Sequence, residues 1–339
     1  MVSFQHRFAS GLRARGIDVC YDLTDHPYQG ILVIGGTRQV FALRRARQSG
    51  IPVVQRLDGM NWVHRLRRTG LKHYLRAEYG NALLSYIRNR IADYVVYQSR
   101  FSEEWWERKY GSTATPSSVV YNGVDLNIYS PGNVDRRPDD FMRILLVEGS
   151  LMGGYELGLE LAIKLGTNLE TRLASAKTSR KEKVIEVLIV GKVAPETQGY
   201  WENQINHFDN TRGLVITWAG LVTPDLIPDI NRSAHLLFSA DINAACPNSV
   251  IEALACGTPV AAFDTGALAE LVVGGAGRLV PYGGDPWKLG EPDIPALVQA
   301  SFEILESQER YCKAARSRAE HAFSLDTMVD GYLRAFSKV

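Results

Sequence analysis

The feature that most constrains this chain is a regular alternation of short apolar runs with segments of helical periodicity. The clearest apolar runs are residues 51–57, 94–98, 142–147 and 184–190, and amphipathic stretches separate them. Short apolar runs between helices are typical of parallel strands that helices cover on both faces. The pattern predicts an α/β fold built from doubly wound, Rossmann-like sheets.

The remaining expected elements follow the same rule. Further strands are expected over residues 19–23, 30–34, 118–121, 215–218, 235–239 and 259–263. Helices are expected over residues 4–15, 38–49, 80–89, 101–110, 155–165, 200–207, 224–233, 249–254, 301–322 and 325–336. Doubly wound sheets bind ligands at the carboxyl ends of their strands, so functional residues are expected there.

The length and one irregular segment together predict two domains. A chain of 339 residues is too long for one ordinary core. Residues 130–140 contain prolines, a glycine and charges, with almost nothing that could pack, and form the best linker in the sequence. We expect a first domain over residues 1–135 and a second over residues 141–323.

The bulk composition excludes several classes of protein. The formal net charge of +1 gives no reason to expect nucleic acid as the main partner. No run approaches the roughly 18 apolar residues of a membrane span. The seven histidines show no metal-ligand spacing, so neither a zinc site nor another cofactor is expected. Four scattered cysteines predict a reduced, cytoplasmic protein: Cys20, Cys246, Cys256 and Cys312.

The most informative segment runs from residue 246 to residue 270. It reads as a loop, a short helix that begins at Asn248 or Ser249 and ends at Gly257, a strand, and a turn at Gly266 that opens another helix. Two helix N-termini at the ends of parallel strands would point free N–H groups at one place. Such a place suits a diphosphate.

Glu252 has two interpretations within this segment. Ser249 followed three residues later by Glu252 matches a capping box, in which the acid only reaches back to the start of its own helix. Alternatively, the carboxylate accepts hydrogen bonds from two adjacent hydroxyls of a ligand. Gly266 likewise could be an ordinary turn glycine or part of a phosphate-binding loop.

The order of the whole segment resembles a known signature. Residues 246–272 are similar to the donor site of the retaining glycosyltransferases of family four, which have the GT-B fold. Residues 119–125 with 129–131, residues 97–99 and the two C-terminal helices resemble other parts of that family. The resemblance implies two facing Rossmann-like domains, with a C-terminal helix at about 324–339 that packs back on the first. It also implies metal-independent, retaining transfer of a hexose from a nucleoside diphosphate sugar to a glycan or lipid-linked acceptor, in a cleft between the domains.

The resemblance also assigns roles to individual residues. Glu252 would hold the ribose hydroxyls of the donor, and Glu270 would brace the loop before it. The amides of Gly266, Ala267 and Leu268 would bind the diphosphate, while Gly220 falls where the family contacts the base. Other expected donor-binding residues are Asn248, Ser249, Ser150 and Lys192.

Two departures from the family concern the donor. Its usual first glutamate, eight positions before Glu252, is Ala244 here, so Asp241, Asn243 or Asn248 would have to contact the sugar. The family often has an Arg and a Lys after the first strand of the second domain. Residues 149–154 contain Ser150 but no cation, which leaves Lys192 as the substitute.

Two more departures concern the first domain. Asp58 stands where the family often has a histidine, and it could bind or deprotonate the acceptor as a catalytic residue. It could equally be an Asp-Gly turn residue that bonds its own backbone. The family also has a strand and a glycine-rich loop before a helix like residues 4–15, so we expect the sequence to be N-terminally incomplete.

A basic cluster spans residues 64–76. One interpretation is peripheral contact with an anionic membrane surface, at the inner face, or with a phosphorylated acceptor. The other is an ordinary solvated surface. A rival to the enzyme as a whole is a glycosyltransferase-like protein that binds nucleotide or glycan without catalysis. A third alternative is a nucleotide-sugar epimerase of the same fold.

Overall fold

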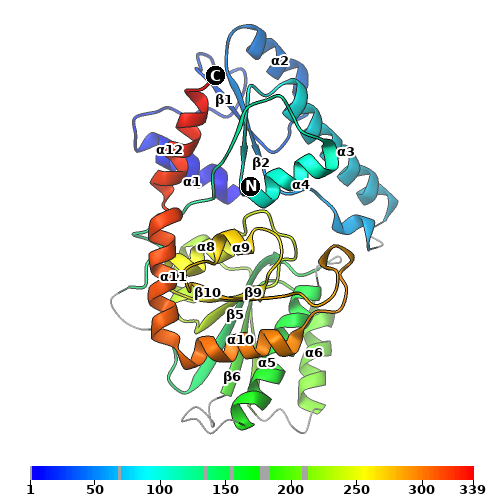
Figure 1. Cartoon of the computed structure of the whole chain (residues 1–339), viewed down its shortest axis with the longest axis vertical. Helices are drawn as coiled ribbons and strands as arrows, with labels where there is room; N and C mark the ends of the chain where they lie inside the picture. The colour runs from blue at the N-terminus through cyan, green and yellow to red at the C-terminus, as the bar shows by residue number, and fades with distance from the viewer. Residues whose placement is uncertain (1, 68–69, 133–135, 153–155, 176–183, 208–212) are drawn as a thin grey trace. The chain divides into compact units, whose positions relative to one another are not determined.

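The computed structural model describes residues 2–67, 70–132, 136–152, 156–175, 184–207 and 213–339. The chain divides into two compact units, the first formed by Met1–Asp125 with Ala322–Val339 and the second by Leu126–His321. Each unit is a parallel sheet with helices on its faces (Figure 1), which confirms the predicted α/β fold class. Among the described residues, no helix is long and apolar enough to cross a membrane.

The first unit contains a four-stranded parallel sheet in the order β1-β2-β3-β4. The strands are β1 (Ile31–Ile34), β2 (Val53–Leu57), β3 (Tyr94–Tyr97) and β4 (Ser117–Val119). The helices are α1 (Val2–Arg13), α2 (Val40–Gln48), η1 (Val63–Arg65), α3 (Leu71–Arg90), α4 (Arg100–Tyr110) and α12 (Leu325–Phe336).

Alternate strand residues bury the two faces of this sheet. Val54 and Val96 pack against Phe4 of α1 and Tyr332 of α12 on one face. On the other face, Val53 packs against α2 and α3. The C-terminal helix α12 therefore belongs to the first unit, where α1 and α12 lie side by side (Figure 1).

The predicted strand over residues 19–23 is wrong. Residues 17–20 form no regular element, and Tyr21 is largely exposed. Asp22 accepts hydrogen bonds from the backbone N–H and the hydroxyl of Thr24, both at 2.9 Å. This local side-chain bonding favours a turn over a strand.

The second unit contains a six-stranded parallel sheet in the order β10-β9-β8-β5-β6-β7. The strands are β5 (Phe141–Ser150), β6 (Val184–Lys192), β7 (Leu214–Gly220), β8 (Leu236–Ser239), β9 (Val260–Phe263) and β10 (Gly277–Val280). The helices are α5 (Leu157–Ser175), α6 (Pro195–His207), η2 (Pro224–Leu226), α7 (Ile227–Arg232), α8 (Asn248–Ala255), α9 (Leu268–Leu271), η3 (Pro286–Lys288), α10 (Ile294–Glu306) and α11 (Gln308–Ala322).

The core of this unit lies between the sheet and helices α5 and α10. Buried strand residues such as Ile144 and Phe238 pack there against Leu165 and Ile304. Helices α8 and α9 cover the opposite face (Figure 1). The helix predicted over residues 301–322 is interrupted at Ser307, which separates α10 from α11.

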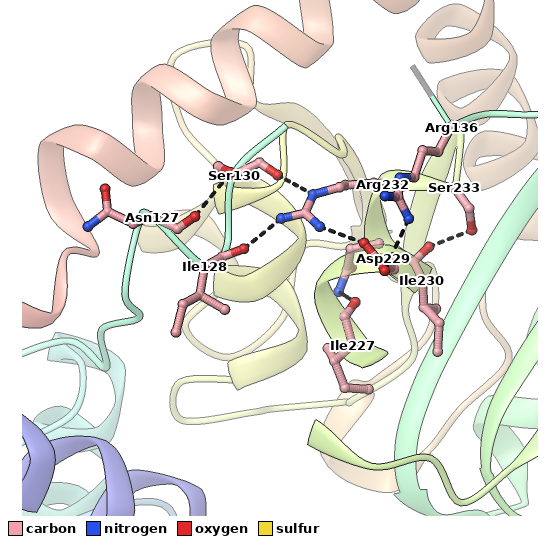
Figure 2. Close-up of polar contacts among 10 residues, drawn as sticks. Asn127, Ile128, Ser130, Arg136, Ile227, Asp229, Ile230, Arg232 and Ser233 are labelled. Atoms are coloured by element: carbon pink, nitrogen blue, oxygen red, sulfur yellow. Dashed lines mark hydrogen bonds and ion pairs between the residues drawn. The ribbon is translucent and has the colours of Figure 1, made fainter. Parts of the chain in front are cut away.

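The boundary between the units precedes the proline-rich linker rather than falling within it. Arg232 donates to the carbonyl oxygens of Ser130 and Ile128, both at 2.6 Å, and pairs with Asp229 at 2.6 Å (Figure 2). Arg316 donates to the carbonyl of Tyr129 at 2.8 Å. These two arginines tie residues 126–130 to the second unit.

Candidate functional site

The sheet of the second unit has a topological switch point between β5 and β8. From β5 the chain adds β6 and β7 on one side, and it then returns to place β8 on the other side. Connections leave in opposite directions at such a point, so a crevice opens at the carboxyl ends of the two strands. The donor-binding residues predicted from the sequence all follow or end strands at this carboxyl edge.

The start of α8 tests the capping-box interpretation of Glu252. The N-cap position is Pro247, which has no side-chain acceptor, and Asn248 is the first helical residue. Ser249 therefore lies inside the helix, and the predicted capping box is wrong. Glu252 sits one turn into α8 with 8% of its surface exposed. The Pro247 side chain cannot accept hydrogen bonds from the first N–H groups of α8. These donors at the positive end of the helix therefore suit an anion.

The loops after β8 and β9 are held together as one surface. The backbone N–H of Asn243 donates to the Thr265 hydroxyl at 3.3 Å, and that of Ala267 donates to the Ala244 carbonyl at 2.8 Å. Asn243 adopts a left-handed conformation with φ of 58°. These hydrogen bonds hold the two loops in one conformation in the absence of a ligand.

The glycine turn differs in detail from the expected diphosphate loop. The amides of Ala267 and Leu268 already donate to the carbonyls of Ala244 and Thr265. Within the described residues, the Gly266 amide makes no backbone hydrogen bond. The helix after the turn, α9, is a single turn of four residues, so its dipole is weak. The diphosphate roles of these three amides stay predictions.

Arg318 braces this region, and sequence reasoning missed it. The guanidinium of Arg318, on α11, donates to the carbonyl of Leu271 at 3.0 Å and to that of Glu270 at 2.7 Å. These carbonyls end α9, where an arginine is favourable. No local sequence pattern distinguishes Arg318 from other basic residues of its helix.

Ser150 and Lys192 are brought together by strand register. They are paired across β5 and β6, and each is the last residue of its strand. Both are solvent-exposed, and the Lys192 carbonyl accepts from the N–H of Leu151 at 2.9 Å. Lys192, the cation predicted for the site, is therefore exposed beside Ser150. This position would let it take the place of the Arg and Lys pair that the family often has.

Two carboxyl groups flank the switch point. Burial raises the pKa of Glu148, near the end of β5, well above its usual range, and the nearby Asp241 charge adds to this. Asp241 follows β8. Part of its surface is exposed, but the surrounding protein desolvates the carboxyl group and so also raises its pKa. The backbone of Glu148 lies directly against Gly191, because a Cβ atom at position 191 would come within 2.1 Å of the Glu148 carbonyl oxygen. The sequence suggested Asp241 but not Glu148.

Gly220 lies at the far end of the same edge. It ends β7 with φ of 64°, in the left-handed region. Its neighbour Trp218 donates through the indole N–H to Glu202 of α6 at 2.8 Å. This bond orients the indole beside the turn where the base was expected.

Asp58 belongs to the first unit. It follows β2, and its backbone carbonyl accepts from the hydroxyl of Ser102 at 3.0 Å and the indole of Trp106 at 2.7 Å. Helix α4 therefore fixes the Asp58 backbone at the carboxyl edge of that sheet. Its catalytic role stays a prediction.

Comparison with solved structures identifies the class that this architecture defines. Sucrose-phosphate synthase from Thermosynechococcus elongatus superposes with a TM-score of 0.66 at 19% identity, covering 99% of this chain and 78% of that one. HepE of Anabaena, in complex with UDP and glucose, gives 0.62 at 19% identity, covering 91% and 78%. Two parallel-sheet units of this kind are the GT-B fold of glycosyltransferases.

Family comparisons place the chain within that class. Residues 32–128 match Glycosyltransferase Family 4, and residues 167–301 match Glycosyl transferases group 1. The chain therefore contains the domain types of the family 4 and group 1 glycosyltransferases. A curated relative, the D-inositol 3-phosphate glycosyltransferase of Gordonia bronchialis, is 28% identical over 241 residues. The match covers 68% of this chain and 48% of that protein, so it spans about half the length of the relative.

Proposed function

We propose that the chain is a hexosyltransferase that uses a nucleoside diphosphate sugar. It transfers the hexose to a glycan or lipid-linked acceptor, with retention and without a metal ion. The observation that carries the proposal is Glu252, which lies outside any capping box and is buried on α8, the helix that connects the loop after β8 to β9. The UDP and glucose bound to HepE, which is similar in fold, support the same donor class.

Each part of the donor would meet a group of matching chemistry. The Glu252 carboxylate accepts from two adjacent ribose hydroxyls, which a single hydroxyl acceptor cannot do. The N-terminus of α8, Ser150 and Lys192 stabilise the diphosphate through N–H and O–H donors and a positive charge. A protonated Glu148 adds a donor and removes a charge that would repel the phosphates.

The chemical step would follow the front-face course of retaining enzymes in this family. As the bond from sugar to diphosphate breaks, the leaving phosphate accepts the proton of the attacking hydroxyl. Charge that develops on the leaving group is stabilised by fixed donors and by Lys192. Asp58 would bind the acceptor, or it would take this proton in place of the leaving phosphate.

A thermal-shift series with UDP, GDP, ADP and their sugar conjugates tests the proposal. A nucleotide at about a hundred times its dissociation constant should stabilise the fold by about 2.7 kcal/mol. The shift should disappear in Glu252→Ala and persist in Glu303→Ala, which loses contacts of α10 with Arg278 and Gln299. An unchanged shift in Glu252→Ala would refute the assigned site.

A second candidate is a binding protein without transferase activity. It is favoured by Ala244, which cannot contact a sugar hydroxyl, and by the absence of a cation in residues 149–154. Release of free hexose from the bound donor, measured without acceptor, separates the two. A protein that only binds should release none.

We also propose peripheral membrane contact, at the cytoplasmic face, through the basic segment 64–76. Helix α3 begins within it and exposes an apolar stripe, with Leu71 74% and Leu75 59% exposed beside Tyr74 and Tyr79. Residues 64–76 contain five Arg and Lys residues and no acid, and the next acid, Glu78, pairs with Arg65. Exposed leucines and tyrosines among cations are typical of surfaces that enter anionic bilayers. Arg68 lies outside the described residues.

A further inference from the structure

Asn243 carries a buried amide group that the folded protein leaves without a partner. Its side chain lies in a residue only 4% exposed, and within the described part of the chain the Nδ2 atom makes no hydrogen bond. An unpaired buried donor lowers stability, so such a group needs an explanation. Asn243 follows β8 at the switch point and directly precedes Ala244, the position at which the family's first glutamate is absent.

The backbone conformation at this position is also unfavourable for a residue with a side chain. Asn243 has φ of 58°, in the left-handed region that glycine adopts without strain. A glycine at this position would remove both the strain and the unpaired donor. Strain and an unpaired polar group at one residue, at the edge of the sheet where ligands bind, indicate a functional role for the amide.

Neighbouring contacts hold this amide in one place. The N–H of Asn243 donates to the Thr265 hydroxyl at 3.3 Å, and the next carbonyl, that of Ala244, accepts from the N–H of Ala267 at 2.8 Å. A Cβ atom at position 266 would come within 2.7 Å of the Asn243 carbonyl carbon. The backbone on both sides of the side chain is therefore fixed, which preorganises the amide for a ligand.

We propose that the Asn243 amide contacts the sugar of the nucleotide-sugar donor in place of the absent glutamate, an inference that rests on the proposed function. An amide has two N–H donors and one acceptor oxygen, which match sugar hydroxyls because hydroxyls both donate and accept. A diphosphate can only accept. Asp241, two residues earlier in the chain, carries a carboxyl group that would repel a phosphate when ionised but can accept from a hydroxyl.

Calorimetry on Asn243→Gly tests this contact. The probes are the free nucleoside diphosphate and the sugar conjugate that the thermal-shift series selects among those of UDP, GDP and ADP. The dissociation constant of the conjugate divided by that of the free diphosphate isolates the sugar. Asn243→Gly should raise this ratio about tenfold, the effect of one lost hydrogen bond, and leave binding of the free diphosphate unchanged. The matched control is Leu289→Gly, because Leu289 is also left-handed, with φ of 50°, and follows η3.

The melting temperature without ligand gives a second measurement. If the amide serves a ligand, Asn243→Gly should melt at the same temperature as the unsubstituted protein or higher, since strain and an unpaired donor are removed. A ratio that is unchanged in Asn243→Gly would overturn the proposal, and a lower melting temperature with it would show that the role of Asn243 is structural. If no nucleotide binds the unsubstituted protein, the proposed function itself fails, and this inference fails with it.

Discussion

Gly266 lies directly against the backbone of Ala244. A Cβ atom at position 266 would come within 2.5 Å of both the amide nitrogen and the carbonyl oxygen of Ala244. Gly266 also has φ of 62°, and the following N–H donates to the same carbonyl at 2.8 Å. Glycine is therefore required for two reasons, conformation and close approach. The contact joins the loops after β8 and β9, and α8, which carries Glu252, follows the first of these loops.

Gly266→Ala should disrupt this joined surface. The left-handed conformation alone costs a non-glycine residue about 1–2 kcal/mol, and the backbone clash adds to it. We expect a lower melting temperature and loss of nucleotide-induced stabilisation. The matched control is Gly274→Ala, which has φ of 65° but no atom within 4 Å of the added carbon. Equal effects of the two substitutions on nucleotide binding would contradict the proposed contact.

Arg318→Met should loosen the turn after Gly266. The substitution removes two hydrogen bonds to the carbonyls of Glu270 and Leu271 but keeps most of the apolar stem. We expect nucleotide affinity to fall several-fold, with a loss of stability of about 1–3 kcal/mol. Arg310→Met, on the same helix, is the control. If both variants bind nucleotide like the unsubstituted protein, Arg318 does not shape the site.

The pH dependence of stability should reveal Glu148. In the unfolded chain its carboxyl has an ordinary pKa of about 4.3, whereas burial raises the pKa in the folded protein. The folded state binds the proton more tightly, so stability falls as pH rises from about 4 through the raised pKa. Glu148→Gln keeps the neutral form, and its melting temperature should fall less over this range.

The affinity for nucleoside diphosphates should also fall as pH rises. As pH rises, the Glu148 carboxylate forms near Asp241 and repels the diphosphate. Calorimetry across the pH range should show weakening in the unsubstituted protein and a flatter profile in Glu148→Gln. Identical profiles would show that Glu148 does not face the donor.

Substitutions on α3 test the proposed membrane contact. Leu71→Ser with Leu75→Ser should strongly reduce co-sedimentation with vesicles that contain anionic lipid, because both side chains are largely exposed. Raising the salt concentration should also release the protein, since the attraction of cations for the surface is screened. Leu221→Ser, at a residue 70% exposed in the second unit, is the control. No binding to anionic vesicles at any salt concentration would refute the contact.

Local patterns were enough to predict much of the fold. Apolar runs such as residues 184–190 formed central strands because burial on both faces demands continuous hydrophobicity. The order of the elements and the glycine turn at residue 266 also followed from local chemistry. Strand β10 was missed because Gly277 and Arg278 interrupt its apolar pattern. Gly277 is needed there, since a side chain would come within 2.1 Å of the Val260 carbonyl oxygen.

The sequence by itself determined the parallel α/β class, the second-unit strands except β10, and the edge at which Glu252 and Gly266 lie. Periodicity and turn chemistry act over a few residues, so they can be read along the chain. Only the tertiary structure decided that Ser249 lies inside α8, that Arg318 reaches the turn after Gly266, and that burial and the Asp241 charge raise the pKa of Glu148. The last two relationships join residues far apart in sequence, and their energies depend on burial and distance, which exist only once the sheets have formed.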